Sequence, residues 1–185
     1  ARVYFIFRYL GHEAVSILDG GMGAWTAEWD NDVEVGEVEP VPIVFSARPQ
    51  SDMVASKAEV HAAMTSGKTL VDMRSNDHYL GINSTHVVVR SGTIPGAVNV
   101  PMTWLTVNEG LRFRAPTQLR MLWTLAGLNP ESPQILFCNS GLESAVGWLA
   151  LGAQLGNSAV KLYDGSLAEW SADPSLPMTA AVALD

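Results

Sequence analysis

An internal repeat constrains the fold of this chain more than any other feature of its sequence. Residues 10–25 (LGHEAVSILDGGMGAW) and 155–170 (LGNSAVKLYDGSLAEW) align without a gap at an offset of 145, and seven of the sixteen positions are identical. A period this long indicates duplicated domains rather than a solenoid of short repeats. In each copy we expect a helix that ends at Leu-Gly, a short strand, and an Asp-Gly turn into a second helix that carries a tryptophan.

The repeat divides the chain into unequal parts. Subtracting 145 from the position of Cys138 gives a position before Ala1, and the first copy keeps roughly thirty residues, too few to bury a core alone. We expect the missing portion to be a separate or cleaved polypeptide that completes the first domain, because exposed loop tips are preferred sites of nicking. The expected division is 1–29, the C-terminal remnant of a first domain; 30–52, an interdomain linker; 53–176, a complete second domain; and 177–185, a tail.

The second domain alternates between helical patterns and short apolar strands. Ser56 and Glu59 form a capping-box pattern that opens a helix. The other expected elements are strands at 69–73, 96–100 and 134–137, helices from Thr117 to Gly127 and from Ser144 to Leu155, and a long polar loop at 74–93. This alternation predicts an α/β fold with a central, largely parallel sheet and helices on both faces.

Composition excludes several classes of function. The 185 residues carry a net charge of -8 at pH 7, which argues against nucleic acid and anionic membrane as partners, since both require a basic face. No apolar run reaches the length of a membrane span. The single cysteine excludes an intrachain disulfide and a multi-cysteine zinc site, but it does not identify the compartment.

Cys138 is the candidate nucleophile, at the end of a strand that we expect to be central. The residues that lead from it into the next helix are Asn139, Ser140, Gly141, Leu142, Glu143 and Ser144. Such a strand–loop–helix turn points backbone N–H groups inward and adds the positive end of a helix dipole, and both favour the nucleophilic thiolate. An ordinary buried core cysteine is the general alternative, but the polar residues that follow Cys138 favour a functional role.

The order of the motifs resembles the rhodanese family over nearly the whole chain. The matching segments are 70–74 (LVDMR), 92–101 (GTIPGAVNVP), 137–138 with the loop that follows, 160–170 (VKLYDGSLAEW) and, in the first copy, 15–25. The resemblance implies a rhodanese-like fold and the double displacement of tandem-domain thiosulfate and 3-mercaptopyruvate sulfurtransferases. The Cys138 thiolate would take a sulfane sulfur from a small anionic donor and pass it, through a persulfide, to a thiophilic acceptor such as cyanide or a thiol. No cofactor is implied besides that covalent sulfur.

The loop after Cys138 departs from both family patterns. Thiosulfate-type members carry a basic residue directly after the cysteine, where this chain has Asn139, and Glu143 adds a negative charge. The mercaptopyruvate-type pattern, Cys-Gly-Ser/Thr-Gly-Val-Thr, agrees better because Ser140 and Gly141 match it, although Asn139 and Glu143 break it too. The loop therefore favours 3-mercaptopyruvate without identifying the donor.

Substrate-binding side chains are expected after the Asp-x-Arg segment. Arg74 occupies the arginine position of the family, and Asp72 is expected to orient it or the loop. His78 and His86 stand where the resemblance implies further arginines, with Arg90 close by. If the two histidines line the pocket, turnover of anionic donors should rise as pH falls. The equally weighted alternative is that both are exposed loop residues.

Other site classes fit the sequence less well. A cysteine phosphatase requires an arginine six positions after its nucleophile, where this chain has Ser144, and the four histidines show no metal-ligand spacing with Cys138. Trp148 is expected to support the loop from beneath. The remaining alternative function is a catalytically weak sulfur-carrier or binding module that has kept the fold.

Overall fold

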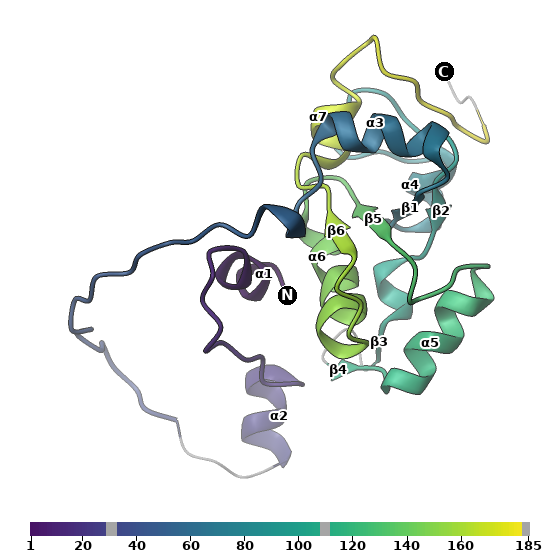
Figure 1. Cartoon of the computed structure of the whole chain (residues 1–185). Coiled ribbons are helices and arrows are strands. Elements are labelled where there is room, and N and C mark those ends of the chain that lie inside the picture. Colours follow the sequence, from purple (N-terminus) through teal and green to yellow (C-terminus); the bar gives the residue numbers. More distant parts are fainter. Residues whose placement is uncertain (29–32, 108–111, 183–185) are drawn as a thin grey trace.

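The computed structural model describes residues 1–28, 33–107 and 112–182. Its centre is a four-stranded, entirely parallel sheet in the order β2-β1-β5-β6 (Figure 1). The strands are β1 (Thr69–Asp72), β2 (Val98–Asn99), β5 (Gln134–Phe137) and β6 (Val160–Leu162), with β3 (Thr106–Val107) and β4 (Arg112–Phe113) as a separate antiparallel pair. The helices are α1 (Arg2–Tyr9), α2 (Gly21–Glu28), α3 (Lys57–Ser66), α4 (Asn76–Leu80), α5 (Pro116–Leu125), α6 (Leu142–Trp148) and α7 (Ser166–Trp170). Shorter turns are the 3-10 helices η1 (Ser51–Met53) and η2 (Met102–Trp104) and the π-helix η3 (Leu149–Gln154).

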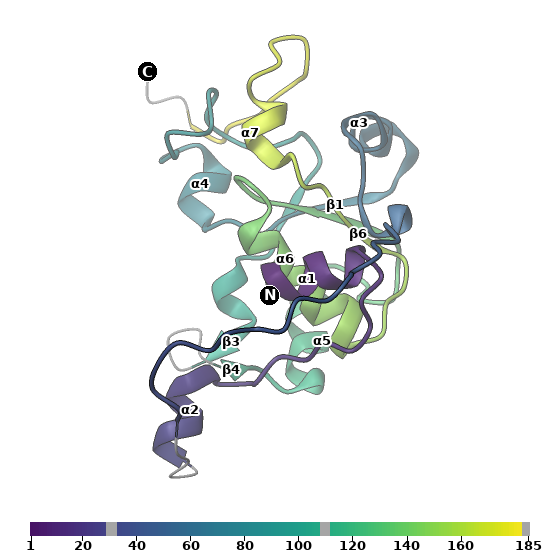
Figure 2. The same ribbon diagram turned by 90° about the vertical axis from the view of Figure 1, so that its left-hand side faces the viewer.

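Helices cover both faces of the sheet, with α3 and α7 on one side and α5 and α6 on the other (Figure 2). Successive residues of a strand point to opposite faces. Leu70 and Ile135 therefore pack with α3 and α7, whereas Val71, Leu136 and Leu162 pack with α5 and α6. Because both faces are covered, the carboxyl edge of the sheet is where a ligand can approach. The predicted α/β fold is confirmed.

Some element boundaries differ from the prediction. α5 begins at Pro116 rather than at Thr117, because proline is well suited to the first helical position, where its missing N–H costs nothing. The loop expected at 74–93 contains the short helix α4. The helix expected from Ser144 begins at Leu142 and continues into the π-helix η3. No helix in the described parts of the chain has the length and hydropathy of a bilayer crossing.

The first copy of the repeat keeps its helices but not its strand. Gly11 and Gly156 both have the predicted left-handed backbone, with φ of 82° and 79°. α2 carries Trp25 as α7 carries Trp170. Residues 15–18, in contrast, form no strand. Their counterpart β6 pairs with β5, whereas no strand among the described residues pairs with 15–18, and an isolated strand is not stable in water.

Apolar side chains of the first copy are exposed where their counterparts in the second copy are buried. Ile17 and Leu18 are 41% and 43% exposed, whereas the equivalent Leu162 and Tyr163 are buried. Residues 33–50 follow as an exposed stretch without helix or strand, as expected of the linker (Figure 1). The division of the chain into domains stays a prediction.

Candidate active site

Cys138 lies directly after β5, between the ends of β1 and β6, in the predicted strand–loop–helix turn. Its side chain is 1% exposed. The Cys138 Sγ accepts hydrogen bonds from the backbone N–H of Gly141 at 3.2 Å and from the hydroxyl of Ser144 at 3.5 Å. Both donors belong to the turn itself, Gly141 as the residue before α6 and Ser144 in its first turn. Two hydrogen-bond donors of the turn therefore point at the sulfur.

The start of α7 holds the outer side of this loop. The carbonyl oxygens of Cys138 and Asn139 accept hydrogen bonds from the N–H groups of Leu167 and Ala168, at 3.0 and 2.9 Å. In a planar trans peptide the C=O and N–H groups point in opposite directions. The N–H groups of Asn139 and Ser140 therefore point away from α7.

Ser166 is a site residue that sequence analysis missed. Its buried hydroxyl accepts a hydrogen bond from the N–H of Cys138 at 3.2 Å and donates one to the carbonyl of Tyr163 at 2.8 Å. Its φ of 50° lies in the left-handed region, which is uncommon for residues other than glycine. The repeat carried the signal, because the position 145 residues earlier is Gly21, whose φ is 58°. Ser166 thus keeps a backbone conformation of the repeat and adds a hydroxyl that fixes Cys138.

A buried ion pair lies at the end of β1, beside the cysteine loop. The Asp72 carboxylate accepts hydrogen bonds from Arg74 Nε at 3.0 Å and Nη2 at 2.6 Å, and from the Thr93 hydroxyl at 2.7 Å. Arg74 also donates to the carbonyl of Gly92 at 2.7 Å, and both charged side chains are fully buried. Arg74 Nη1 alone has no hydrogen-bond partner among the described residues. Asp72 thus holds the Arg74 guanidinium in place, and a role of Arg74 in substrate binding stays a prediction.

Glu143 connects this ion pair with the cysteine. It lies in the first turn of α6 and is half-buried. Burial raises the pKa of the Glu143 carboxyl, and the charge of Asp72 raises it further, while the charge of Arg74 and a hydrogen bond with Cys138 oppose the rise. The carboxyl beside the sulfur therefore holds its proton to higher pH than an ordinary glutamate does.

Comparison with known proteins identifies the family. The model of the rhodanese-like domain matches residues 56–173. The chain belongs to the rhodanese family. The thiosulfate sulfurtransferase of Corynebacterium glutamicum is 33% identical over 183 residues, which cover 94% of this chain and 60% of that protein. Human 3-mercaptopyruvate sulfurtransferase is 32% identical over 172 residues, which cover 91% of this chain and 57% of the human protein. The chain thus spans less than two thirds of the length of these relatives.

Solved structures agree with this assignment. Wild-type EanB superimposes with a TM-score of 0.88 and 25% identity, covering 98% of this chain and 44% of EanB. A second EanB structure, with the same TM-score, contains a cysteine persulfide together with ergothioneine. Residues before the matched segment 56–173 therefore also have an equivalent in EanB, because the superposition includes nearly the whole chain.

Not all of the predicted substrate residues of this rhodanese meet at the cysteine. Arg90 donates hydrogen bonds to four carbonyl groups of residues 170–176, at 2.7 to 3.2 Å. These bonds hold the segment at the end of α7 and after it and do not support the predicted role of Arg90 in substrate binding, which stays a prediction. His86 is exposed. His78 lies in α4, and its Nδ1 is buried with no hydrogen-bond partner among the described residues. A role of either histidine in donor binding stays a prediction.

The N-terminal segment packs against the rhodanese domain behind the cysteine loop. α1 lies beside α6 in Figure 1 and in front of it in Figure 2, and the Phe5 ring meets Trp148 edge-on with centroids 4.9 Å apart. Trp148, expected beneath the loop, thus joins α6 to α1. Arg2 forms an ion pair with Asp164 and donates a hydrogen bond to the carbonyl of Gly141 at 3.5 Å.

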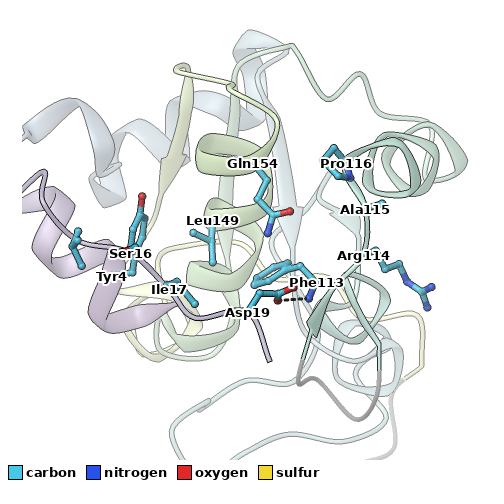
Figure 3. Close-up of a pocket in the computed structure, with 11 residues that line it drawn as sticks. Tyr4, Ser16, Ile17, Asp19, Phe113, Arg114, Ala115, Pro116, Leu149 and Gln154 are labelled. Atoms are coloured by element: carbon cyan, nitrogen blue, oxygen red, sulfur yellow. Dashed lines mark hydrogen bonds between the residues drawn. The ribbon is translucent and has the colours of Figure 1, made fainter. Parts of the chain in front are cut away.

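A cleft of about 440 Å³ lies along the same contact, between residues 15–19 and the start of α5 (Figure 3). Beside it, the Asp19 carboxylate accepts a hydrogen bond from the N–H of Phe113 at 3.0 Å. Cys138 does not line this cleft. The cleft is thus a gap between the first copy and the rhodanese domain, separate from the cysteine.

Among the described residues, no group of three His, Cys, Asp or Glu side chains is arranged to hold a metal ion.

Proposed function

We propose that this chain carries the active site of a rhodanese-type sulfurtransferase, with Cys138 as the sulfur carrier. The observation that carries the proposal is the pair of hydrogen bonds that the Gly141 N–H and the Ser144 hydroxyl donate to the Cys138 Sγ at the carboxyl edge of the sheet. Donors around a sulfur stabilise it as an anion, which is its nucleophilic form. The relatives named thiosulfate and 3-mercaptopyruvate sulfurtransferase support the same chemistry.

The reaction is a double displacement. The Cys138 thiolate attacks the sulfane sulfur of the donor and forms an S–S bond. The bond between that sulfur and the rest of the donor breaks, and its electron pair leaves with sulfite from thiosulfate, or with the enolate of pyruvate, which then takes up a proton. In the second step cyanide or a thiolate attacks the outer sulfur of the persulfide, and the thiolate of Cys138 is released. The N–H and hydroxyl groups that hydrogen-bond to the thiolate also stabilise the charge of the persulfide.

The charge around the sulfur supports 3-mercaptopyruvate over thiosulfate as donor. Glu143 places a carboxyl in the first turn of α6, next to the loop that holds Cys138, and Asn139 supplies no positive charge to offset it. Thiosulfate brings two negative charges to this point, whereas 3-mercaptopyruvate brings a single carboxylate. Repulsion therefore disfavours thiosulfate more strongly.

Incubation of the protein with each donor and cyanide tests the proposal. We expect thiocyanate from 3-mercaptopyruvate, less from thiosulfate, and none from the Cys138→Ser variant. Intact mass after incubation with donor alone should show one additional sulfur atom on the wild-type chain and none on the variant. Absence of both thiocyanate and the added sulfur would favour the alternative, a binding module that has kept the fold.

We also propose that further polypeptide, homologous to the strands of the second domain, covers the apolar side chains of the first copy. The support is the exposure of Ile17, Leu18 and Met22, whose counterparts in the second copy are buried. Such side chains gain free energy when a neighbouring sheet removes them from water. Native mass spectrometry of the protein from its source should show a second polypeptide with rhodanese motifs. A bare chain of 19.9 kDa would contradict this proposal.

A further inference from the structure

We propose that Arg2 is a positioning residue for the sulfur-transfer loop. Arg2 belongs to the first copy of the repeat and is 139 residues from Gly141 in the sequence, yet its guanidinium reaches the Gly141 carbonyl. The inference rests on the proposed role of Cys138 and adds a component to it. It assigns part of the geometry of the active-site loop to a segment outside the residues that match the rhodanese family, 56–173.

Arg2 contacts the loop through an ion pair and a long hydrogen bond of 3.5 Å. Arg2 Nη1 donates hydrogen bonds to the Asp164 carboxylate and to the Gly141 carbonyl. A Cβ atom on Gly141 would lie 2.6 Å from Asp164 Oδ1 and 2.8 Å from Arg2 Nη1, and the φ of Gly141 is 83°. The ion pair therefore lies directly on the glycine, and a side chain at this position would clash with it as well as strain the backbone.

This contact sets the direction of a backbone donor. With the Gly141 carbonyl held by Arg2, the N–H of Leu142 in the same trans peptide points to the opposite side. α7 holds the carbonyls of Cys138 and Asn139 in the same manner. Carbonyl groups of the loop are thus held outward at three points, two from α7 and one from α1. The N–H of Gly141, one peptide earlier, makes the hydrogen bond to the sulfur.

Arg2 is presented by an anchored helix. Phe5, one turn further along α1, is 3% exposed and packs against Trp148 of α6. At the other end of α1, the carbonyl of Tyr9 accepts a hydrogen bond from the N–H of Gln50 at 2.7 Å. The anchored backbone keeps the guanidinium within reach of the loop, and the ion pair with Asp164 gives it a second partner there.

Three variants test the inference. Arg2→Gln removes the charge, and Arg2→Lys keeps it. Arg8→Gln is the matched control, because Arg8 lies on the same helix and, in the described part of the chain, its guanidinium donates a hydrogen bond only to the carbonyl of Glu13. We expect Arg2→Gln to lower kcat for sulfur transfer about fivefold, which is about 1 kcal/mol in activation free energy. KM and the thermal midpoint should stay near the wild-type values. Arg2→Lys should recover most of the loss.

A measurement that needs no turnover separates this inference from the proposed function. The amide resonances of Gly141 and Leu142 should shift in Arg2→Gln and stay in place in Arg8→Gln. If the wild type transfers no sulfur but these resonances shift, the proposed function fails and the positioning role stands. Wild-type kcat in Arg2→Gln, or amide shifts no larger than those of Arg8→Gln, would overturn the role of Arg2. A loss of kcat that only follows a loss of folded protein would overturn it equally.

Discussion

Replacing Glu143 by glutamine is expected to change which donor the protein prefers. Glutamine has nearly the same shape but no charge, so the substitution removes a negative charge from the point where the donor sulfur must arrive. Glu143 lies in the first turn of α6, directly after the cysteine loop, and the charge of the buried Asp72 acts on its pKa. The packing of α6 should not change, because the Glu143 side chain is half-buried rather than part of the core.

The size of the effect follows from the charges. A unit charge about 4 Å from a carboxylate costs about 1 kcal/mol in water and about 4 kcal/mol at an effective dielectric constant of about 20. The half-buried Glu143 carboxyl belongs toward the lower end of this range. Thiosulfate carries one more negative charge than 3-mercaptopyruvate. The ratio of kcat/KM for thiosulfate to that for 3-mercaptopyruvate should therefore rise about tenfold in Glu143→Gln.

The same reasoning gives a dependence on pH. Burial and the charge of Asp72 raise the pKa of the Glu143 carboxyl, so its charge and the repulsion of thiosulfate disappear as pH falls through that raised value. The wild-type donor ratio should thus rise toward lower pH, and the ratio of Glu143→Gln should stay flat over the same range. Since the pKa is raised in the folded state, the stability linked to Glu143 is present below the unfolded value and lost as pH rises.

Steady-state kinetics with both donors and cyanide measure the ratio. The control is Glu131→Gln, which changes the net charge equally but lies before β5, at the opposite edge of the sheet, where Glu131 pairs with Arg120. A donor ratio in Glu143→Gln within twofold of wild type, or an equal change in Glu131→Gln, would refute the electrostatic account of donor choice.

Three further predictions concern stability and are measured by urea unfolding followed through tryptophan fluorescence. Ser166→Ala leaves the buried N–H of Cys138 without its acceptor and should lower the free energy of unfolding by about 1 to 3 kcal/mol; an unchanged value would mean that another acceptor replaces the hydroxyl. Phe5→Ala opens a gap under α1 and should cost about 3 kcal/mol, whereas a cost near zero would mean that α1 is detached in solution. The pKa of Glu59 is lowered to about 2 by hydrogen bonds, first from Lys161. Its stabilisation is therefore present above the ordinary value of 4.5 and lost as pH falls toward 2. Because the pair is exposed, Glu59→Gln should remove less than about 1 kcal/mol near neutral pH, and a loss that persists at pH 2 would contradict the assignment.

Local sequence patterns predicted the frame of the domain well. The capping box of Ser56 and Glu59 is present, and the apolar run at 134–137 is the buried strand that positions Cys138. These features depend on neighbours in the sequence, such as a helix cap or a continuous apolar run between polar segments. The central position of the cysteine at the carboxyl edge of the sheet followed from the same patterns.

Contacts between distant residues could not be predicted in this way. The sequence suggested Arg90 as a cation for a substrate, but the fold surrounds its guanidinium with carbonyl groups. Which acceptors meet a guanidinium depends on the path of the loops, and a residue pattern carries little information about that path. The strand predicted at residues 15–18 is absent for a related reason. A strand requires a partner, and the local sequence does not specify one.

The packing of Phe5 against Trp148 makes the docking of α1 an intramolecular binding event, in which one segment of the chain binds the domain that follows it. Phe5 belongs to the same core as the α6 residues, yet residues 33–50, an exposed stretch without helix or strand, lie between α1 and that domain in the sequence. Binding of this kind depends on the effective concentration that the linker imposes. A synthetic peptide with the sequence of α1 should therefore compete with the attached helix for its contact with α6, and a chain cut within residues 33–50 should reassemble from its two pieces. Such a pair of fragments would report, by their own dissociation constant, how strongly one copy of the repeat holds the other.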